Sequence, residues 1–539
     1  MPAAPVLIVG AGPTGMTAAL DLAHYCIPSI LFDEDHALSE GSRAIAYSSA
    51  TLQTWEKLGA AQAMLAKGVA WSVRHTYFRE RELYTQNFQQ SGAGYLPRFF
   101  NLQQYYVERY LLDQIEGNPL IDLRLDNRVN GCRQDAGKVA LQVASPQGEQ
   151  EIEGRYVLAC DGARSTLRKL LNLPFPGVTH RDHFLIADVR VALQSPSEPR
   201  FFFDHPSNPG QTVLIHPQPD GIWRMDWQVG AEVDIQVERD PVRMDRRIRP
   251  LIGDLPYEIV WLSDYRFHQR LLSRFRHGQI FFLGDAAHLV APFGARGMNS
   301  AVADVENLVW KLALVLDHSA PDSLLDTYQA ERWPAQQHNQ VVTNTTMRFM
   351  APPNSVRRAL RNLVLRLSGF YPPARRWVDS GKMVEPFTYT GSPLITPDDA
   401  PPKDWQAPPP LGSKAPDAPC ALIPEGSSEC RPVFLRTLLG SGFVVLYFAG
   451  SPGEGQPFLQ AARPNLPGLP IQVYTVVRQP SPLPVQGSSL VDESGALHQA
   501  FAAVPGTLYL IRPDGHISAR RRNARPAELL SMVWTASGG

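Results

Sequence analysis

The stretch from Val6 to Gly15 constrains the fold of this chain more than any other. Its first residues, Val6–Val9, form a short apolar run that is typical of a buried parallel strand. Three glycines follow with the spacing G-x-G-x-x-G, which permits a tight turn, lets an anion approach the backbone and brings the next helix close to the strand. The bare N–H groups at the start of that helix attract an anion. We expect the anion-binding residues to be Gly10, Gly12, Pro13, Thr14 and Gly15.

The residues after this turn complete a nucleotide-binding unit. A helix is predicted for residues 16–23 and a strand for Ser29–Phe32, and the strand ends at Asp33 and Glu34. Asp33 lies about 20 residues after the glycines, where a carboxylate can accept the hydroxyl protons of a ribose. The alternative is a glycine turn with only a structural role. The full order of strand, turn, helix, strand and acidic residue favours dinucleotide binding.

Length and composition exclude several other classes of protein. At 539 residues the chain is long enough for two or three domains, and its net charge of -1 gives no footprint for nucleic acid. Five cysteines without a C-x-x-C pair argue against a disulfide framework or a metal site and fit a reducing cytoplasm. The first residues lack the basic region of a signal peptide, and no uncharged apolar run is long enough to span a membrane. We therefore expect a cytoplasmic protein without a membrane partner.

A second strand-to-helix corner lies near the middle of the chain. An apolar strand at residues 155–159 runs into Asp161 and Gly162, and Ser165 is placed to cap the helix that follows. An Asp-Gly turn of this kind is common in any α/β protein, so the motif is weak by itself.

A third corner is more informative. An apolar strand at residues 280–283 ends at Gly284 and Asp285, and Asp285 is placed to accept a hydroxyl group at the strand end. The loop 292–297 then leads into a long helix, expected at residues 299–317, whose N-terminus favours a ligand with negative charge. The alternative is a turn followed by an ordinary capped helix.

Between the second and third corners the pattern changes to short strands separated by Pro, Gly, Asp and Asn turns. We expect a mostly antiparallel sheet, inserted between two halves of the nucleotide-binding domain, with one face free to cover a ligand. Within it, the segment from Trp223 to Trp227 alternates between polar and apolar residues. The expected strands are 184–191, 200–203, 212–216 and 221–229.

The last part of the chain is predicted to be a separate small domain behind a Pro-rich linker. Polar helices lead to it, with a kink or break expected at Trp333-Pro334. Two parallel-looking strands followed by a hairpin and a final helix indicate a thioredoxin-like order, without the C-x-x-C of a redox-active domain. The expected elements are a helix at 431–439, strands at 443–448, 471–477 and 507–511, a turn at 512–515 and a helix at 526–534.

Together, the three corners resemble a known family. The motifs are Gly10-x-Gly12-x-x-Gly15, Asp161-Gly162 with Ser165 and Arg168, and Gly284-Asp285 with the loop from Pro292 to Asn299. This set resembles the single-component FAD-dependent aromatic hydroxylases of the p-hydroxybenzoate hydroxylase-like group. Within that group the chain looks most like the branch of 3-(3-hydroxyphenyl)propionate hydroxylases and polyketide hydroxylases, which also carries a thioredoxin-like C-terminal domain without redox cysteines. The resemblance covers nearly the whole chain.

The resemblance implies an α/β fold with a Rossmann-like FAD-binding domain, an inserted and mostly antiparallel substrate sheet, a helical linker and a thioredoxin-like C-terminal domain. The implied domains are 1–181 for the first part of the FAD-binding domain, 182–270 for the substrate sheet, 271–396 for the second part with its helices, 397–419 for the Pro-rich linker and 420–539 for the thioredoxin-like domain.

The resemblance also implies a tightly bound FAD and assigns residues to it. The pyrophosphate would bind the glycine turn, and the adenosine ribose would bind Asp33. Arg43 and Gln104 would contact the flavin or its ribityl-phosphate chain, and Asp285 would bind the ribityl chain. Asp161 would lie in a motif linked to both FAD and NAD(P)H. Their sequence neighbours Glu34 and Gly284 belong to the same expected site.

Two further groups surround the flavin ring in this family. The residues expected at the pyrimidine edge are Gly297, Met298 and Asn299. Those expected around the oxygen site at flavin C4a are Pro292, Phe293 and Gly294, and no catalytic acid or base is assigned. Ala301 stands where the family usually has Gly.

The implied reaction is a monooxygenation of a phenolic or polyketide-like aromatic substrate. NAD(P)H, a transient co-substrate, would reduce FAD, and O2 would then give a flavin C4a-hydroperoxide that passes one oxygen to the ring. The substrate would lie between the flavin and the inserted sheet. His216 and Tyr265 are candidates for assisting phenol deprotonation. The substrate candidates by strand position are Phe203, His216, Met225 and Trp227, each with ordinary sheet packing as the alternative.

Several alternatives stay open at this point. The same scaffold supports Baeyer–Villiger oxidation, epoxidation or reduction, and a non-catalytic flavin-binding protein is a further possibility. A flavin halogenase is not expected, because the segment W-x-W-x-I-P is absent from the sequence. We consider a homodimer as the assembly, although the sequence leaves the oligomeric state open.

Overall fold

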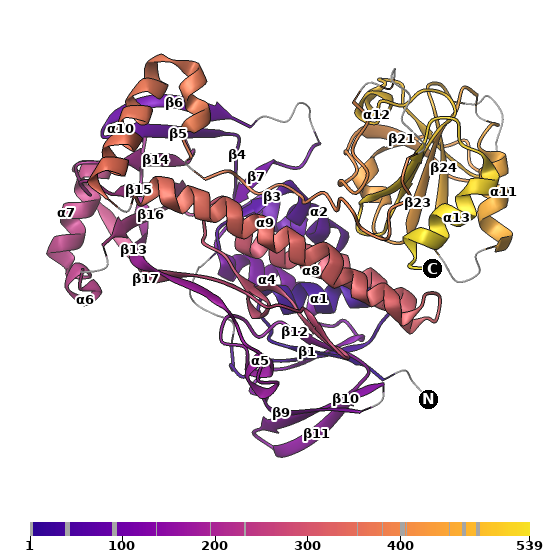
Figure 1. Cartoon of the computed structure of the whole chain (residues 1–539), viewed down its shortest axis with the longest axis horizontal. Helices are drawn as coiled ribbons and strands as arrows, with labels where there is room; N and C mark the ends of the chain where they lie inside the picture. The colour runs from indigo at the N-terminus through magenta and orange to yellow at the C-terminus, as the bar shows by residue number, and fades with distance from the viewer. Residues whose placement is uncertain are drawn as a thin grey trace. The chain divides into compact units, whose positions relative to one another are not determined.

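A computed structural model of the chain describes residues 4–37, 44–88, 94–135, 137–194, 196–230, 233–352, 354–379, 381–398, 405, 407–451, 453–465, 470–480 and 486–539 (Figure 1). The chain forms two compact units. The first comprises Met1–Leu20, Ser29–Ala303 and Gln336–Glu385, and the second comprises Asp21–Pro28, Asp304–Ala335 and Pro386–Gly539. The five domain boundaries expected from the sequence stay predictions.

A six-stranded sheet of the first unit contains the strands that precede all three corners. Its spatial order is β18 (Arg276–His277), β19 (Ile280–Phe282), β12 (Val157–Ala159), β1 (Val6–Val9), β2 (Ser29–Phe32) and β8 (Ile121–Arg124). All neighbours are parallel except β18 and β19. The register pairs Val9 with Ala159 and Ala159 with Phe282. The carboxyl ends of β1, β12 and β19 therefore lie side by side, at the edge where doubly wound sheets bind ligands.

Local sequence explains why the first corner forms. All four residues of β1 are buried, as expected for an apolar strand between two parallel neighbours. The helix α1 (Pro13–His24) begins at a proline, whose missing N–H would have had no partner in the first turn of a helix. The strand, turn and helix expected from the sequence are thus present.

The second sheet of this unit has eight strands and is mostly antiparallel, since only β14 and β5 are parallel. Its order is β20 (His288–Leu289), β17 (Tyr257–Leu271), β13 (Gly177–Val191), β16 (Ile222–Val229), β15 (Thr212–Pro217), β14 (Arg200–Phe203), β5 (Val73–Phe78) and β6 (Arg81–Asn87). One face packs against α7 (Pro241–Ile252). The other face carries a second apolar core, which includes Phe293, Met347 and Leu365. The predicted α/β fold with an inserted sheet is confirmed.

Smaller elements complete the chain. The short sheets are β9 (Arg128–Asp135), β10 (Lys138–Ser145) and β11 (Gly148–Gly154), and β3 (Ala46–Ser48), β7 (Phe99–Asn101) and β4 (Val69–Trp71). The remaining helices that precede the seven-stranded sheet of the second unit in the sequence are α2 (Ser49–Lys57), α3 (Ala61–Lys67), α4 (Gln104–Ile115), α5 (Thr166–Leu170), α6 (Ile235–Glu238), α8 (Arg296–Leu316), α9 (Asp326–Met350) and α10 (Ser355–Phe370).

The second unit contains a seven-stranded sheet with the order predicted for its core. The sequence of strands in space is β22 (Arg431–Phe434), β21 (Pro419–Ile423), β25 (Ser488–Val491), β24 (Ile471–Val477), β23 (Phe443–Phe448), β26 (Thr507–Ile511) and β27 (Ile517–Arg521). Strands β23 and β24 are parallel, and β26 and β27 form an antiparallel hairpin. The helices are α11 (Gln456–Asn465), α12 (Ala496–Ala500) and the final α13 (Pro526–Ala536).

Two local predictions are wrong. Residues 431–439 are not one helix but strand β22 followed by the 3-10 turn Leu435–Leu438. Pro432 fits an edge strand, where its missing N–H removes no ladder hydrogen bond, and β22 is at the edge. The expected break at Trp333-Pro334 is absent, since α9 continues through it, as Figure 1 also shows, and only the alternative of a kink stays a prediction. The buried, bonded side chains of Glu331 and Arg332 hold the helix together next to Pro334.

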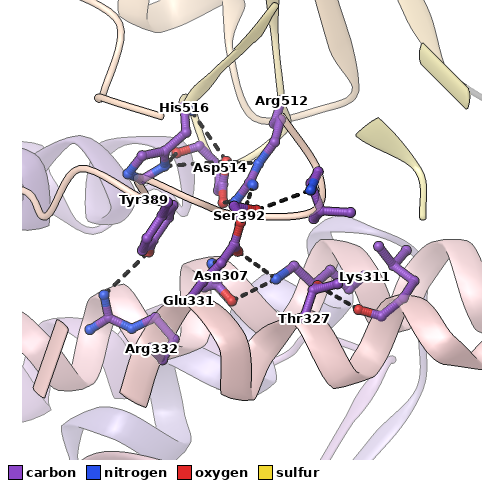
Figure 2. Close-up of polar contacts among 12 residues, drawn as sticks. Asn307, Lys311, Thr327, Glu331, Arg332, Tyr389, Ser392, Arg512, Asp514 and His516 are labelled. Carbon is purple, nitrogen blue, oxygen red and sulfur yellow. Dashed lines mark hydrogen bonds and ion pairs between the residues drawn. The ribbon is translucent and has the colours of Figure 1, made fainter. Parts of the chain in front are cut away.

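The side chain of Glu331 lies at the centre of a buried polar cluster in the second unit (Figure 2). Its Oε2 accepts hydrogen bonds from Lys311 Nζ and Asn307 Nδ2, each at 2.7 Å. Its Oε1 accepts a hydrogen bond from Ser392 Oγ at 2.6 Å. The guanidinium of Arg512 donates to both carboxylate oxygens. The cluster therefore joins α8 and α9 to the turn that follows β26.

The charges of this cluster balance. Arg512 also bonds to Asp514, so two cations face two carboxylates, all of them buried. Burial alone would raise the pKa of Glu331, but the charges of Arg512 and Lys311 outweigh it and hold that pKa well below its usual value. Burial lowers the pKa of Lys311 to about 8, against the charge of Glu331. Each charge thus depends on its partners.

We expect Glu331→Gln to lower the free energy of unfolding by about 3–5 kcal/mol, because it leaves buried Lys311 and Arg512 without their shared carboxylate. Urea unfolding followed by circular dichroism measures the shift. As a control, Asp113→Asn removes an exposed pair with Arg109 on α4 and is expected to cost less than about 1 kcal/mol. Equal shifts in the two variants would contradict a stabilising role for the cluster.

Candidate functional site

Of the three glycines in the turn after β1, one has open space beside its α-carbon and the other two are in close contact with backbone atoms. Gly10 has a φ of +103°, and a β-carbon there would lie 2.5 Å from the carbonyl oxygen of Cys160. A β-carbon on Gly15 would lie 1.9 Å from the carbonyl oxygen of Gly10. On Gly12, by contrast, a β-carbon would meet nothing within 4 Å. Gly10 and Gly15 are therefore needed for packing, whereas Gly12 leaves space for an anion at the start of α1.

The carboxylate of Asp33 lies against the same turn. Its Oδ2 accepts a hydrogen bond from the backbone N–H of Ala11 at 2.5 Å, and its Oδ1 accepts one from that of Asp35 at 3.0 Å. Burial raises the pKa of Asp33. Glu34 is exposed instead, and its Oε2 lies 3.5 Å from Arg128 Nε. Of the two predicted acidic residues, only Asp33 bonds to the glycine turn.

The second corner, after β12, holds a buried carboxylate and an arginine. Asp161 Oδ2 accepts a hydrogen bond from the N–H of Leu167 at 3.0 Å, while Oδ1 is buried without a hydrogen-bond partner among the described residues. Burial raises the pKa of Asp161. Ser165 caps α5 by accepting from the N–H of Arg168 at 3.0 Å. Arg168 Nη1 donates to the carbonyl of Ala286 at 3.0 Å, which ties the second corner to the third.

The third corner, after β19, meets the first. Gly284 has a φ of +56°, and a β-carbon there would lie 3.1 Å from Thr14 Oγ1 and 3.0 Å from Ala301 Cβ. Thr14 belongs to the start of α1 and Ala301 to α8, so the beginnings of both helices lie around Gly284. The alanine at position 301 is accommodated because residue 284 has no side chain. Asp285 follows in an exposed position.

The loop between β20 and α8 is held by packing and by the backbone. Phe293 is buried, with its ring 5.8 Å from that of Phe184 in an edge-to-face contact. Gly294 has a φ of +77°, and a β-carbon there would lie 2.1 Å from the carbonyl oxygen of Lys382. Pro292, between the buried residues of this loop, is exposed. The loop is therefore packed against its neighbours at Phe293 and Gly294 and exposes the ring of Pro292.

The start of α8 offers a second open backbone position. A β-carbon on Gly297 would meet nothing within 4 Å, and Met298 is half-buried. The Oδ1 of Asn299 accepts hydrogen bonds from the N–H of Ser48 at 2.8 Å and from Thr51 Oγ1 at 2.6 Å. The Asn299 side chain therefore fastens α8 to α2. The first N–H groups of any helix have no partner within it, so those of α8 are candidates for binding a ligand.

One predicted contact residue, Gln104, is the first residue of α4. Gln104 Oε1 accepts a hydrogen bond from the N–H of Ala44 at 3.1 Å, and its Nε2 donates to Glu108 Oε1 at 2.8 Å. Gln104 thus binds the backbone of Ala44, the residue that follows Arg43 in the sequence. Arg43 itself lies outside the described residues.

The four substrate candidates lie on opposite faces of the eight-stranded sheet. Phe203 belongs to the core that contains Phe293, and the alternation of β15 puts His216 on this face. Met225 and Trp227 belong to the other core, against α7. The structure therefore does not bring these two residues to the Phe293 loop. The physical reason is the two-residue period of a strand, which separates neighbours onto different faces.

Charged residues on the Phe293 face were not among the predictions. Arg224 donates to both carboxylate oxygens of Asp188 at 2.8 Å, and both side chains are almost fully buried. Asp226 lies two residues further along β16 on the same face. Arg74 on β5 is also buried and donates to the carbonyl of Gly381 at 2.9 Å. The sequence signal that could have identified these residues is the alternation within β16, where polar residues between buried apolar ones indicate that the second face of the strand is not ordinary apolar core.

The first unit thus presents residues that fit a dinucleotide. Open backbone at Gly12 and Gly297 lies at two helix N-termini, and the carboxylate of Asp33 follows the strand next to the first of them. Over the described ranges, no group of three or more His, Cys, Asp or Glu side chains is arranged to hold a metal ion. In the same part of the chain, no helix combines the length and hydropathy needed to cross a membrane.

Comparison with known families agrees with this geometry. A family model described as "FAD binding domain" matches residues 3–345. Because the match covers more than half of the sequence, the chain belongs to this family of FAD-binding domains, and its cofactor is FAD. The resemblance inferred from the three corners is confirmed.

Individual relatives extend the likeness to the whole chain. The 3-(3-hydroxy-phenyl)propionate/3-hydroxycinnamic acid hydroxylase of Mycolicibacterium smegmatis is 27% identical, over 98% of this chain and 92% of that protein. The para-nitrophenol 4-monooxygenase of a Pseudomonas species is 28% identical, over 61% of this chain and 82% of that protein. The fold is similar to the crystal structure of the flavin-dependent monooxygenase PieE in complex with FAD and substrate, with a TM-score of 0.82, 22% identity and coverage of 99% and 98%.

Substitutions at Gly12 and Gly15 are expected to separate cofactor binding from folding. Gly12→Ala adds a methyl group that meets no protein atom within 4 Å, so the fold is retained while the added group occupies the anion space. We expect its FAD dissociation constant to rise about tenfold or more, with an unchanged melting temperature of the apoprotein. Fluorescence titration with FAD measures the first quantity, and circular dichroism measures the second.

The matched variant is Gly15→Ala, whose methyl group would overlap the carbonyl oxygen of Gly10. We expect this variant to lose melting temperature or soluble yield before any FAD is added. If Gly12→Ala binds FAD with wild-type affinity, the anion does not bind at this turn.

Proposed function

We propose that this chain is an FAD-dependent monooxygenase that uses NAD(P)H and O2 to hydroxylate a phenolic or polyketide-like aromatic compound. The observation that carries the proposal is the meeting of three strand-to-helix corners in an FAD-binding domain that also contains a sheet with an aromatic face. The two relatives named above are a hydroxylase and a monooxygenase named for phenolic compounds, and PieE was solved with FAD and substrate. These likenesses support the same class of reaction here.

In this proposal, the backbone at Gly12 binds the FAD pyrophosphate and Asp33 binds the adenosine ribose. The exposed Asp285 binds the ribityl chain, and Gly297 and Met298 meet the pyrimidine edge of the flavin through their backbone. The support is the open space at both glycines and the hydrogen bond between Asp33 and the glycine turn. The remaining contacts expected from the resemblance are Pro13, Thr14, Glu34, Arg43, Gln104, Asp161, Gly284 and Asn299.

Bound FAD supplies the redox chemistry, since it accepts a hydride from NAD(P)H and activates O2. The chain supplies placement and electrostatics. The N–H groups at Gly297 and Met298 lie in the first turn of a helix of 21 residues, whose positive end stabilises negative charge on a ligand. Buried Phe293 and the backbone contact of Gly294 hold the adjacent loop in place and exclude water from its inner side.

The face of the sheet beside this loop suits a planar aromatic substrate. The rings of Phe184 and Phe267 lie 4.7 Å apart, and those of Phe267 and Phe293 lie 5.6 Å apart. Phe201 and Phe203 continue the same core on β14. Aromatic walls of this kind favour offset or edge-to-face contact with a ring. Cytoplasmic location and a homodimeric assembly stay predictions.

We expect purified protein to be yellow and to oxidise NAD(P)H faster when a phenol is added. The probes are 3-(3-hydroxyphenyl)propionate and para-nitrophenol, and product mass spectrometry reads the outcome. One oxygen added to the ring supports the proposal. A lactone, an epoxide or a saturated product would assign another reaction to the scaffold. Bound FAD without phenol-stimulated oxidation would indicate a non-catalytic flavin protein, and colourless protein that takes up no FAD would contradict both readings.

We expect Phe293→Ala to raise the share of NAD(P)H oxidation that ends in hydrogen peroxide by at least about twofold, because it opens the buried side of the loop to water. A peroxide assay together with product quantification gives this share. Phe293→Leu is the matched control, since it keeps an apolar side chain at the same place and is expected to stay closer to wild type. An unchanged share in Phe293→Ala would mean that this ring does not exclude water.

A further inference from the structure

The polar residues of β16 point to the aromatic side of the eight-stranded sheet. Trp223, Met225 and Trp227 pack in the core on the α7 side. The residues between them, Arg224 and Asp226, therefore point to the opposite face, because successive side chains of a strand alternate. Two charged groups thus stand on the face that the proposed substrate would cover.

Asp226 borders the core that contains Phe293. Its cross-strand neighbours are Ile186 on β13 and Leu214 on β15. Leu214 belongs to that core, and Ile186 packs against it. Asp226 itself is only half-buried, so part of the residue is accessible. A strand therefore holds a carboxylate at a fixed place beside the aromatic wall.

The nearest cation is bound to another carboxylate. Arg224 Nε and Nη2 donate to the two oxygens of Asp188 at 2.8 Å each. The Oδ1 of Asp226, in contrast, is buried and accepts no hydrogen bond from the described residues. A buried carboxylate oxygen without a donor is energetically unfavourable. A ligand hydroxyl group would supply the missing donor.

We propose that Asp226 accepts the proton of the substrate's phenol hydroxyl group, an inference that rests on the function proposed above. The O–H bond of the phenol breaks, its electron pair stays on the phenol oxygen, and the proton forms a new O–H bond on Asp226. Neutral Asp226 then donates a hydrogen bond to the phenolate. The phenolate oxygen raises the electron density at the ortho and para carbons, which are the carbons to be hydroxylated. The proton returns to the phenolate oxygen before the product leaves.

The surroundings of Asp226 suit a proton acceptor near neutral pH. Burial raises its pKa to about 7, while the charge of Arg224 lowers it and that of Asp188 raises it. The carboxylate form, which accepts the proton, therefore predominates above about pH 7 and is lost as the pH falls. Other charged or titratable groups on this face include His216 on β15, Arg74 on β5, Tyr84 on β6 and Tyr265 on β17.

The histidine on this face is a poorer acceptor. The Nδ1 of His216 is also buried without a hydrogen-bond partner among the residues that the structure describes. Burial and the charges of Arg224 and Arg74 lower the pKa of His216 to about 3. His216 therefore stays neutral at pH 7, where it can hydrogen-bond to a substrate but cannot hold its proton.

The test compares wild-type holoenzyme with Asp226→Asn, using 3-(3-hydroxyphenyl)propionate and its ring-fluorinated analogues, which are more acidic phenols of nearly the same size. We expect the wild-type hydroxylation rate to rise with pH through about 7. Asp226→Asn is expected to lose this rise and to slow hydroxylation of the parent phenol about 100-fold. The loss should shrink for the more acidic phenols, because they ionise with less help. A merely structural role would slow all of them equally.

His216→Gln is the matched control, and the rise through about pH 7 should persist in it whatever happens to KM. FAD content reports whether each variant is folded. If Asp226→Asn loses FAD, Asp226→Glu carries the test, because a displaced carboxyl group should move the pH profile and an unmoved profile overturns the proposal. If wild type forms hydroxylated product and Asp226→Asn keeps the wild-type pH profile, the role of Asp226 is overturned while the proposed function stands. Wild type with FAD but no hydroxylated product would overturn the proposed function, and the role of Asp226 with it.

Discussion

The contact between α1 and the ends of β1 and β12 is the constraint on which the first unit depends. A β-carbon at Gly15 would overlap the carbonyl oxygen of Gly10, and one at Gly10 would overlap that of Cys160. Only a chain without these two side chains can bring a helix N-terminus so close to the sheet. Because β12 pairs in parallel with both β1 and β19, the corners after these three strands lie at the same edge of the sheet. Three loops from distant parts of the sequence therefore meet there without further adjustment. The bond from Arg168 to Ala286 then fastens two of them together.

Buried charge is handled differently in the two units. In the second unit, Glu331 and Asp514 face Lys311 and Arg512, so each carboxylate has a cation within bonding distance. Such a closed arrangement fixes the fold but has no capacity left for a ligand. On the aromatic face of the first unit, the pair of Arg224 and Asp188 is also closed, but a further carboxylate stands beside it with a buried oxygen that lacks a donor. The incomplete arrangement, rather than the closed one, is where chemistry with a ligand is expected.

The corners could be predicted because their physics is local. The spacing of Gly10, Gly12 and Gly15 encodes its own turn, and the hairpin after β26 is encoded by its Pro-Asp-Gly turn. Which face of a strand meets a ligand is not encoded in the local sequence. Both faces of β16 are largely buried, and only the packing of α7 distinguishes the face it covers from the opposite one. Strand position alone therefore proposed Met225 and Trp227, which lie on the face packed against α7 and not on the face of Phe293. The continuation of α9 through Pro334 is also a tertiary effect, because Glu331 and Arg332, within three residues of it, form buried ion pairs with α8.

Residue type is likewise a weak guide to which group holds a proton. Histidine has an ordinary pKa near neutrality and aspartate one near 4, so a sequence favours the histidine as a base. On this sheet face the order is reversed, because burial lowers the pKa of His216, which Arg224 and Arg74 lower further, whereas burial raises the pKa of Asp226. Both effects need the register of β13, β15 and β16, which sets the neighbours of each side chain. A strand is a suitable element to position such a carboxylate, because the alternation of side chains and the strand pairing fix the face and the neighbours of the carboxylate beside the aromatic wall. In the proposed function, the three corners bind the cofactor while the sheet holds the substrate and its proton acceptor.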